Sequence, residues 1–555
     1  MEQGRVLIAI ALSFAVFFVW NFFFVEKPDV EQQQPTAVEE TVAETQTESA
    51  PASSTMAPAQ SGDAFVAPEK AGSKDVAAAR TITVKTPLYV VRISENGAVF
   101  KSFELENYRE LADKNSARKN LLDPAYNGQN MKVSLADGGL AGLDAAVFEA
   151  DDSSDTIMVT DMERTLSFTW QSESGVVVEK QFTFSPASYL IGLELAFKNG
   201  SGSGFTDRAA VEIQHALPKT GGYAFEGPSA LLNDKLEQVK IKKIEDNNRL
   251  TGSFKWMAIE DRYFMRSLIP AEPVDGVVAL SVEDKDVVVC QLQRPERTFL
   301  PGETVTYGYK VFFGPKSMAL LNNLGYDLGK AVQFGMFSFI AKPLLWFMNF
   351  IYSILPNYGV AIIILTICTK IVLWPLGNKS YKSMSEMKKI QPLMAEVREK
   401  YKNDKKQMNQ ELMALYKTYK INPMGGCLPM VLQIPVFFAL YRMLYSAIEL
   451  RHTPFVLWIT DLSAPDRLFE FGFSIPFMQP PYGIPVLTLV MGATMFLQQK
   501  MSPPPGDPAQ AKMMMLMPIV FTFIFINFSS GLVLYWLINN VLSISQQYYI
   551  QKKYA

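Results

Sequence analysis

The segment IIILTICTKIVL, residues 362–373, is apolar except for two threonines, a cysteine and Lys370. Trp374-Pro375-Leu376 follows it, and the stretch from 357 to 376 is long enough to cross roughly 30 Å of hydrocarbon at about 1.5 Å per residue. Similar apolar stretches recur at residues 429–440, 484–497 and 513–528, separated by polar segments. Such stretches need lipid or a deep core, so they exclude a purely soluble chain.

The whole-chain composition lies between those of soluble and membrane proteins. Of 555 residues, 48% are apolar and 19% are charged, and the mean hydropathy is +0.07. A net charge of -3 excludes a generally basic nucleic-acid binder. Cys290, Cys368 and Cys427 lie in unlike contexts, and His215 is far from His452. We therefore expect no disulfide framework, no metal site and no cofactor.

The N-terminal 80 residues predict an anchor and a tether. Residues 6–25 are apolar and run into Glu26-Lys27-Pro28-Asp29 without a small-x-small cleavage pattern. A signal peptide remains the alternative, but the length and this flank favour an uncleaved transmembrane anchor at 1–25. Residues 26–80 are rich in Gln, Thr, Ser, Ala, Pro and Glu, which predicts a disordered periplasmic tether.

Residues 81–325 predict a large all-β domain. Short segments with alternating hydrophobicity, such as Thr81–Lys85, Val176–Phe184 and Asp286–Cys290, are typical of strands. Turn dipeptides, among them Asn96-Gly97 and Pro301-Gly302, separate them. A β-sandwich of this size fits one domain.

Charge fixes the expected orientation of the rest of the chain. Residues 379–420 carry eleven basic and five acidic residues, so the positive-inside rule places this segment in the cytoplasm. Its apolar stripes and the break at Asn403-Asp404 predict a helical hairpin over 377–424. The count of crossings then requires residues 326–356 to form an interfacial amphipathic helix rather than a span.

The sequence thus predicts an α-helical polytopic membrane protein with six transmembrane helices, five of them forming the core, a periplasmic all-β sandwich and a cytoplasmic hairpin. The distribution of basic residues places both termini in the cytoplasm. The predicted spans are 1–25, 357–376, 425–450, 483–500, 513–528 and 529–549. A periplasmic loop is expected at 451–482, a cytoplasmic loop at 501–512 and a cytoplasmic tail at 550–555.

Lys370 is a cation inside a predicted span, where a charge costs about 2.5 to 3.5 kcal/mol. It could snorkel to the headgroups near Trp374. Thr366 lies one turn before it, however, and Tyr535, Asn539 and Ser543 share one face of the last span. Together with Gln433 they could line a water-containing cavity open to the cytoplasm. A single polar residue of this kind, however, more often forms a hydrogen bond that holds two transmembrane helices together.

Motifs for catalysis are absent from the sequence. There is no HExxH, GxxxxGK[ST] or GxSxG, so the chain is not expected to be an enzyme. Glu260-Asp261, next to Arg262, could be imagined as an acid/base pair, but a solvated or salt-bridged surface is the commoner arrangement. His215 is expected to be structural.

Several short motifs in the correct order resemble those of YidC-type membrane protein insertases of Gram-negative bacteria. They are Trp374-Pro375-Leu376, Gln391-Pro392, the segment 422–427 (NPMGGC), the segment 433–437 (QIPVF), the segment 499–503 (QKMSP) and the segment 530–536 (SGLVLYW). The resemblance covers essentially the whole chain, and the β domain resembles the sugar-mutarotase-like sandwich, which by itself does not imply sugar binding.

The resemblance implies an insertase and chaperone that works alone or with the Sec translocon. It implies a hydrophilic groove, open to the cytoplasm and lipid, that contains one arginine; Lys370 holds that position here and keeps the charge without the planar fork. The substrate groove is expected to comprise Lys370, Thr366, Gln433, Tyr535, Trp536 and Asn539. The capture hairpin is expected to use Lys388, Lys389, Gln391, Pro392 and Tyr416.

The expected partners are nascent membrane proteins, the Sec translocon, the ribosome with its targeting factors, and membrane lipids, with no small-molecule substrate. A secondary transporter or channel with Lys370 as substrate or proton site is the alternative, and no internal repeat supports it. An anchored periplasmic binding module is a third possibility, although the further spans and hairpin exceed what an anchor needs.

Overall fold

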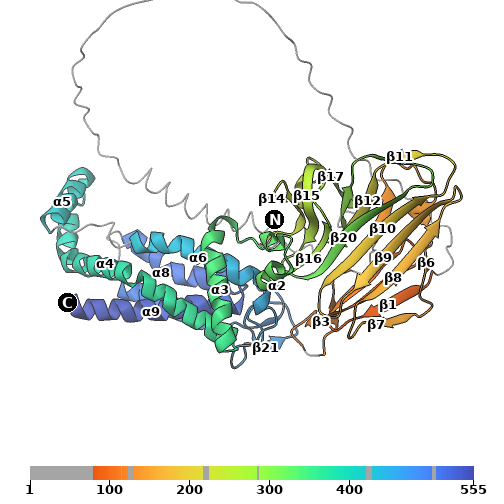
Figure 1. Ribbon diagram of the computed structural model, residues 1–555. Helices are drawn as coiled ribbons and strands as arrows, with labels where there is room; N and C mark the ends of the chain where they lie inside the picture. Colours follow the sequence, from red (N-terminus) through yellow and green to blue (C-terminus); the bar gives the residue numbers. More distant parts are fainter. Residues whose placement is uncertain are drawn as a thin grey trace, which may run out of the picture.

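The computed structural model describes residues 79–554 apart from 114, 123–128, 217–223, 284–286, 420–427 and 503–507. A β domain lies at one end of a group of long helices (Figure 1). The expected anchor at 1–25, nearly all of the tether and the motif at 422–427 lie outside the described residues.

Two sheets form the β domain. The first has the order β4 (Arg118–Asn120), β3 (Val99–Arg109), β2 (Tyr89–Ser94), β1 (Thr81–Lys85) and β7 (Thr156–Met158). The second has the order β5 (Lys132–Leu135), β12 (Ala209–Ala216), β18 (Val287–Gln293), β17 (Val274–Glu283), β15 (Arg249–Glu260), β16 (Phe264–Pro270), β20 (Thr304–Pro315), β10 (Leu190–Asn199), β9 (Val176–Phe184), β8 (Arg164–Gln171) and β6 (Glu149–Ala150). β13 (Gly227–Leu232) pairs with β15 and with β14 (Lys235–Gln238). β11 (Phe205–Asp207) and β19 (Arg297–Phe299) form a separate pair. The short helices are η1 (Leu143–Ala145) and η2 (Ile241–Lys243).

The sheets pack face to face through aromatic side chains. Phe100 of β3 contacts Phe182 of β9, with ring centroids 5.2 Å apart, and Phe313 of β20, at 6.0 Å. All three side chains are fully buried. β9 alternates buried and half-buried positions along its whole length, as the period-2 pattern predicts. The predicted β-sandwich is confirmed.

The chain leaves the sandwich through short helical pieces. α2 (Met318–Leu324), η3 (Leu328–Ala331) and η4 (Gly335–Phe337) precede α3 (Ser338–Ile354), so the expected helix at 326–356 occupies only part of that range. α3 crosses the long helices at a steep angle, near the end that carries the β domain (Figure 1). By length and composition, residues 335–354 and 358–400 qualify as candidate spans among the described residues.

α4 (Tyr358–Lys400) differs from the expected boundary at residue 376. It continues as one helix through Pro375 and Pro392 into the first arm of the hairpin. Beside Pro375, the side chain of Gln546 on α9 donates to the carbonyl of Trp374. The first arm of the hairpin is therefore continuous with a helix of the bundle.

The remaining helices pack around a central C-terminal helix. They are α5 (Lys405–Thr418), α6 (Leu428–Ser446), η6 (Ile448–Leu450), α7 (Val486–Met501), α8 (Pro508–Phe525) and α9 (Ser530–Tyr554), with the hairpin strands β21 (Leu468–Phe471) and β22 (Tyr482–Ile484) before α7. α9 contacts α4, α6 and α7, and α8 packs on α7. The helix bounds differ from the expected spans by a few residues.

Candidate functional site

Lys370 lies in the seam between α4 and α9. Its side chain is buried, with 6% of the residue exposed. Nζ donates to Oγ of Ser543 at 2.6 Å and approaches Oδ1 of Asn539 at 3.5 Å. Both partners are neutral, and the described residues place no carboxylate within ion-pair distance of Lys370. The seam thus holds a cation whose charge no described side chain neutralises.

This geometry bears on the alternative in which Lys370 extends to the headgroups. A snorkelling lysine turns its ammonium away from the helix packing and toward water. Here the ammonium instead points across the seam at Ser543, a residue 173 positions later in the chain. The hydroxyl of Ser543 in turn donates to the carbonyl of Asn539 at 2.6 Å. The lysine is consequently anchored inside the bundle.

Thr366 and Tyr535 are buried near this seam on α4 and α9, and no hydrogen bond to Lys370 is formed by either. Thr366 is buried, and its hydroxyl donates to the carbonyl of Ile362 on its own helix at 2.6 Å. Tyr535 is buried on α9, two turns before Ser543. The face of α9 expected from the spacing of Tyr535, Asn539 and Ser543 therefore does turn toward α4 near Lys370.

Gln433 and Trp536 belong to a neighbouring aromatic region. Trp536 packs edge-on against Phe437 of α6 at 4.7 Å and against Phe525 of α8 at 4.9 Å. Gln433 lies one helical turn before Phe437 and is half-buried. The predicted groove residues thus fall into two groups, one around the ammonium of Lys370 and one around the ring of Trp536.

Gln546 is a polar seam residue that the sequence analysis missed. Its Nε2 donates to Oδ1 of Asn378 at 2.9 Å and to the carbonyl of Trp374 at 3.2 Å. The backbone of Gly377 makes room for it, because a Cβ there would lie 2.8 Å from Nε2. Gln546 follows Ser543 by three residues, so extending the polar face of α9 by one turn would have found it.

The hairpin of α4 and α5 has a small core of its own. Ile390 and Met394 of α4 pack against Leu412 of α5, and the hydroxyl of Tyr416 contacts Sδ of Met394 at 3.9 Å. Of the predicted capture residues, Tyr416 therefore packs inside the hairpin. Lys388, Lys389 and Pro392 are exposed, and Gln391 is half-buried.

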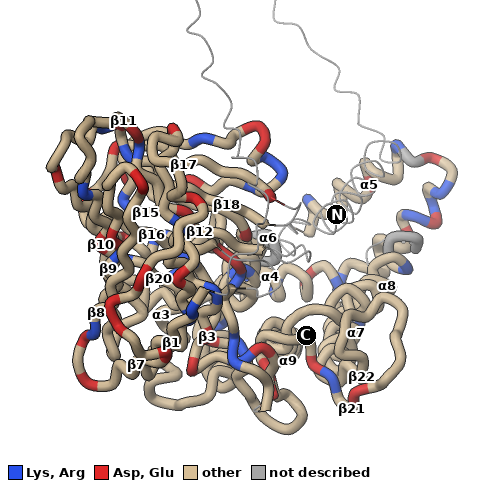
Figure 2. The backbone as a smooth tube through the Cα atoms, turned by 90° about the vertical axis from the view of Figure 1, so that its right-hand side faces the viewer, with Lys and Arg blue, Asp and Glu red and all other residues tan. Residues whose placement is uncertain are grey.

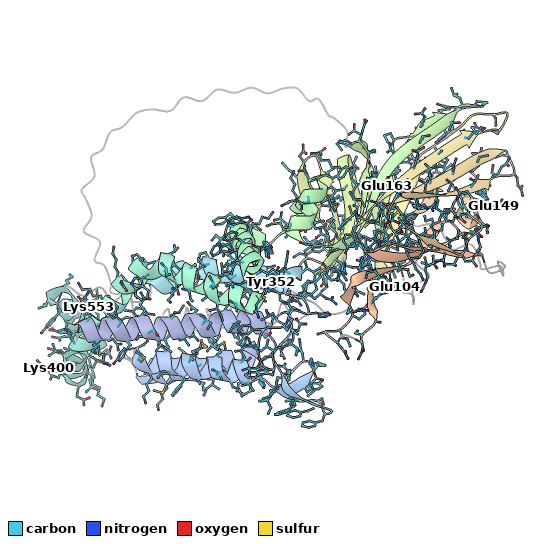
Figure 3. All side chains as sticks on the ribbon, turned by 60° about the horizontal axis from the view of Figure 1, so that its bottom comes forward. Glu104, Glu149, Glu163, Tyr352, Lys400 and Lys553 are labelled. Atoms are coloured by element: carbon cyan, nitrogen blue, oxygen red, sulfur yellow. The ribbon has the colours of Figure 1, made fainter. Side chains whose placement is uncertain are left out.

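Basic residues gather at the end of the helices away from the β domain. Figure 3 shows Lys400, at the end of α4, near Lys553, at the end of α9. Lys and Arg recur along the hairpin in Figure 2, interspersed with a few acidic residues. This is the distribution that the positive-inside argument used.

A loop closes the opposite end of the bundle. The guanidinium of Arg467 donates to the carbonyls of Pro481 at 2.8 Å and of Ile526 at 2.9 Å. The carboxylate of Asp466 accepts from the backbone N–H of Leu487, at the start of α7, at 2.7 Å. The hydroxyl of Ser530, at the start of α9, donates to the carbonyl of Asp461 at 2.7 Å. These contacts tie the ends of α7, α8 and α9 together.

The segment Glu260-Asp261-Arg262 is not the solvated surface that was expected. Glu260 is fully buried, and its carboxylate pairs with Lys316 at 2.8 Å. Arg262 donates to the carbonyl of Tyr445 at 2.8 Å and lies over the ring of Tyr445, 3.6 Å from its centroid. The expectation of salt bridging was right and that of exposure was wrong, because this segment joins the β domain to α6.

Arg451 adds a contact across this junction, and Asp261 orders the β-domain side of it. Arg451 donates to the carbonyl of Arg109 on β3 at 2.7 Å. Asp261 accepts from the backbone N–H groups of Tyr263 and Phe264 and lies 3.5 Å from the guanidinium of Arg266.

His215 lies beside the junction, with Nε2 3.9 Å from Oδ2 of Asp261. Burial holds the pKa of His215 well below its ordinary value, so the ring is neutral near pH 7 and its role is structural. Among the described residues no group of three or more His, Cys, Asp or Glu side chains could hold a metal ion.

Comparison with known proteins identifies the family. The family described as "60Kd inner membrane protein" matches residues 350–555, and the "YidC periplasmic domain" matches residues 81–347. A membrane protein insertase YidC of Syntrophus aciditrophicus is 41% identical over 99% of this chain and 99% of its own length. The chain belongs to the YidC family. A second YidC insertase, from Syntrophobacter fumaroxidans, is 43% identical over 84% of this chain and 86% of its own.

Solved structures were also matched. An active YidC insertase crystal structure aligns over 85% of this chain and 95% of its own, with 17% identity and a TM-score of 0.38. A galactose mutarotase related enzyme from Lactobacillus acidophilus aligns over 42% of this chain, with 10% identity and a TM-score of 0.32. Membership of the YidC family places the chain in the bacterial inner membrane, with a periplasmic domain.

Proposed function

We propose that this YidC-family chain inserts integral proteins into the inner membrane and helps them fold, through a groove that is open to the cytoplasm and contains Lys370. The names of its relatives support the insertase function, and they do not favour a transporter or channel. The single observation that carries the role of the groove is the buried, unneutralised ammonium of Lys370 in the α4–α9 seam.

The charge acts on the polar flank of an incoming segment. Moving such a flank through hydrocarbon is costly, and a groove that reaches partway into the bilayer shortens the dry path. Lys370 attracts acidic residues of the flank because its own partners, Ser543 and Asn539, are neutral and leave its charge uncompensated. A positive field is sufficient for this step, so lysine can stand where the family has arginine.

Release of the segment needs no nucleotide in this scheme. Once its flank has been drawn in, the apolar segment leaves sideways into lipid, driven by burial of its own surface at roughly 25 cal/mol per Å². Hydrogen bonds of Arg467 and Ser530 tie the ends of α7, α8 and α9 together at the periplasmic end, and the flank enters from the opposite, cytoplasmic side.

The orientation follows from charge. The hairpin of α4 and α5 and the C-terminal Lys552-Lys553 face the cytoplasm, and the β domain faces the periplasm. Six spans, including the N-terminal segment 1–25, satisfy this orientation. α3 lies along the periplasmic interface, in keeping with its steep crossing of the bundle (Figure 1).

The hairpin captures clients and meets the synthesis machinery. Lys388, Lys389 and Pro392 are exposed and available to a nascent chain, to ribosomal RNA or to anionic lipid. Tyr416 supports the hairpin from inside. The Sec translocon and targeting factors are further partners for clients that this chain does not insert alone.

The test is complementation of an insertase-depleted bacterium. Wild type, Lys370→Arg, Lys370→Ala and Lys370→Glu are compared by protease protection of a short client with an acidic flank. Lys379→Glu is the matched control, because Lys379 is an exposed lysine of the same helix. We expect Arg and the control to insert the client and Ala and Glu to fail at normal expression. Equal insertion by all the Lys370 variants would refute the role of the charge.

A further inference from the structure

The loop that precedes α7 is unusually aromatic. Residues 468–484, here called the aromatic loop, comprise β21, β22 and the turn between them. Glu470 is its sole charged residue, and its aromatic residues are Phe469, Phe471, Phe473, Phe477 and Tyr482. The proposed orientation puts the loop on the periplasmic side.

The three most exposed of these side chains are phenylalanines that point away from the protein. Phe477 is 90% exposed, Phe469 is 69% exposed and Phe473 is 64% exposed. Each exposed phenylalanine forgoes about 1.5 to 3 kcal/mol that burial would provide. A cluster of this kind marks a surface that another apolar phase covers.

The loop is held firmly in this conformation. Arg467 donates to the carbonyls of Pro481 and of Ile526, which ties the base of the loop to the end of α8. Asn527 donates to the carbonyl of Phe477 at 2.8 Å and accepts from the backbone N–H of Gln479 at 2.8 Å. These bonds fix the backbone at Phe477 and just after it, and the exposed side chain of Phe477 is held in place with it.

The position of the loop identifies what covers it. The loop lies at the end of the bundle opposite the basic hairpin and leads directly into α7 (Figures 1 and 3). α7 has 16 residues, or about 24 Å at 1.5 Å per residue, which is shorter than the roughly 30 Å hydrocarbon core. At the same end, Phe523 of α8 is 62% exposed, so the apolar outer surface of the helices continues into the loop.

We propose that the aromatic loop lies in the outer interfacial zone of the bilayer and anchors the periplasmic end of the α7–α8 pair in lipid. Aromatic side chains favour this zone, and a surface with one charge in seventeen residues suits lipid better than a polar protein partner. The loop thereby completes the apolar band that α7 is too short to provide. The proposal rests on the orientation given above and is independent of the charge of Lys370.

Spin labels on the full-length chain in liposomes test the proposal. A label is placed at Phe477→Cys or Phe473→Cys, and its collision rates with oxygen, which concentrates in lipid, and with a water-soluble nickel chelate are measured. The matched control is Leu300→Cys, at a 58% exposed leucine of the β domain. Because all three side chains are exposed, none of the substitutions removes core packing.

We expect oxygen to exceed the nickel chelate at least several-fold at positions 473 and 477, and the reverse at position 300. Nickel accessibility at 477 equal to that at 300 would place the loop in water and overturn the proposal. A label shielded from both reagents would mean that protein covers the loop, which also overturns it. These outcomes are separate from the complementation results, since labelling reports lipid contact whether or not Lys370 acts in insertion.

Discussion

Replacing Lys370 by methionine should remove insertion without destabilising the helical bundle. Methionine keeps an unbranched apolar stem of similar length and removes the charge. The side chain it replaces is buried, with 6% of the residue exposed. Lys370→Met should therefore lower insertion activity and raise the thermal stability of the helices, whereas removing a purely structural lysine would lower the stability.

The expected change in the free energy of unfolding follows from two opposing contributions. A cation at this depth costs about 2.5 to 3.5 kcal/mol. Its 2.6 Å hydrogen bond to Ser543 returns about 1.5 to 3 kcal/mol, and the 3.5 Å contact with Asn539 adds little. Ser543 keeps its own bond to the carbonyl of Asn539, so the substitution leaves no donor unsatisfied. The variant should be more stable by about 0 to 2 kcal/mol.

The assay is thermal unfolding of the detergent-solubilised chain, followed at Cys368, two residues before Lys370. Thiol modification mapped to the Cys368 peptide reports the helical part separately from the β domain. About 1 kcal/mol corresponds to roughly 2 to 4 °C for a unit of this size, so the midpoint should rise by up to about 8 °C. Ser543→Ala is the matched control and should lower it, because the ammonium then loses its partner at a cost of about 1 to 3 kcal/mol.

Two results would refute this reasoning. A fall of more than about 2 kcal/mol in Lys370→Met would mean that the lysine is a net structural contact. Full complementation by Lys370→Met would mean that insertion does not need the charge.

Three further predictions concern other parts of the molecule. Gly377→Ala should displace the amide of Gln546 and lower the free energy of unfolding by about 1 to 3 kcal/mol. On a Gln546→Ala background the same change should lower it by less than about 1 kcal/mol, which a double-mutant cycle measured by thermal unfolding checks. Burial raises the pKa of Glu212 to about 7, so the folded state keeps this carboxyl protonated where the unfolded state has released the proton, above about pH 4.5. The stability that the protonated carboxyl contributes is therefore lost as the pH rises toward 7. Glu212→Gln should therefore be more stable than wild type in urea unfolding at pH 8 and equal to it near pH 4.5; a gain that does not vary with pH would contradict the assignment. Arg262→Ala removes both the hydrogen bond to Tyr445 and the contact with the Tyr445 ring. Proteolysis between the β domain and α3 should become about 5- to 30-fold faster. An unchanged cleavage rate there would refute the role of Arg262 in docking the β domain.

Much of the architecture follows from local patterns in the sequence. Val176–Phe184 alternates along its length, and the structure makes it β9 with one face buried, because a strand sends successive side chains to opposite faces. The break at Asn403-Asp404 separates α4 from α5, since Asp404 caps α5 by accepting from the backbone N–H of Gln407. The i, i+4 and i+8 spacing on α9 likewise identified Ser543 and Asn539 as the face toward Lys370.

Other features depended on which distant segments meet. Glu260 is a surface residue by sequence statistics, yet it is fully buried because the β domain docks on α6 through Arg262 and Tyr445, 183 residues apart. Trp374-Pro375 is a plausible helix end, yet α4 continues through it in contact with α9, where Gln546, 172 residues later, bonds to the carbonyl of Trp374.

The sequence by itself thus determined many of the strands and helices, the division into β domain and helices, and Lys370 as a buried cation. Each of these depends on hydrophobicity and charge within a window of a few turns. The tertiary structure alone decided the domain junction, the continuity of α4 and the outward aromatic loop. The physical reason is that burial and hydrogen bonding at these places come from side chains far away in the chain, and periodicity carries no information about which of them will pack together.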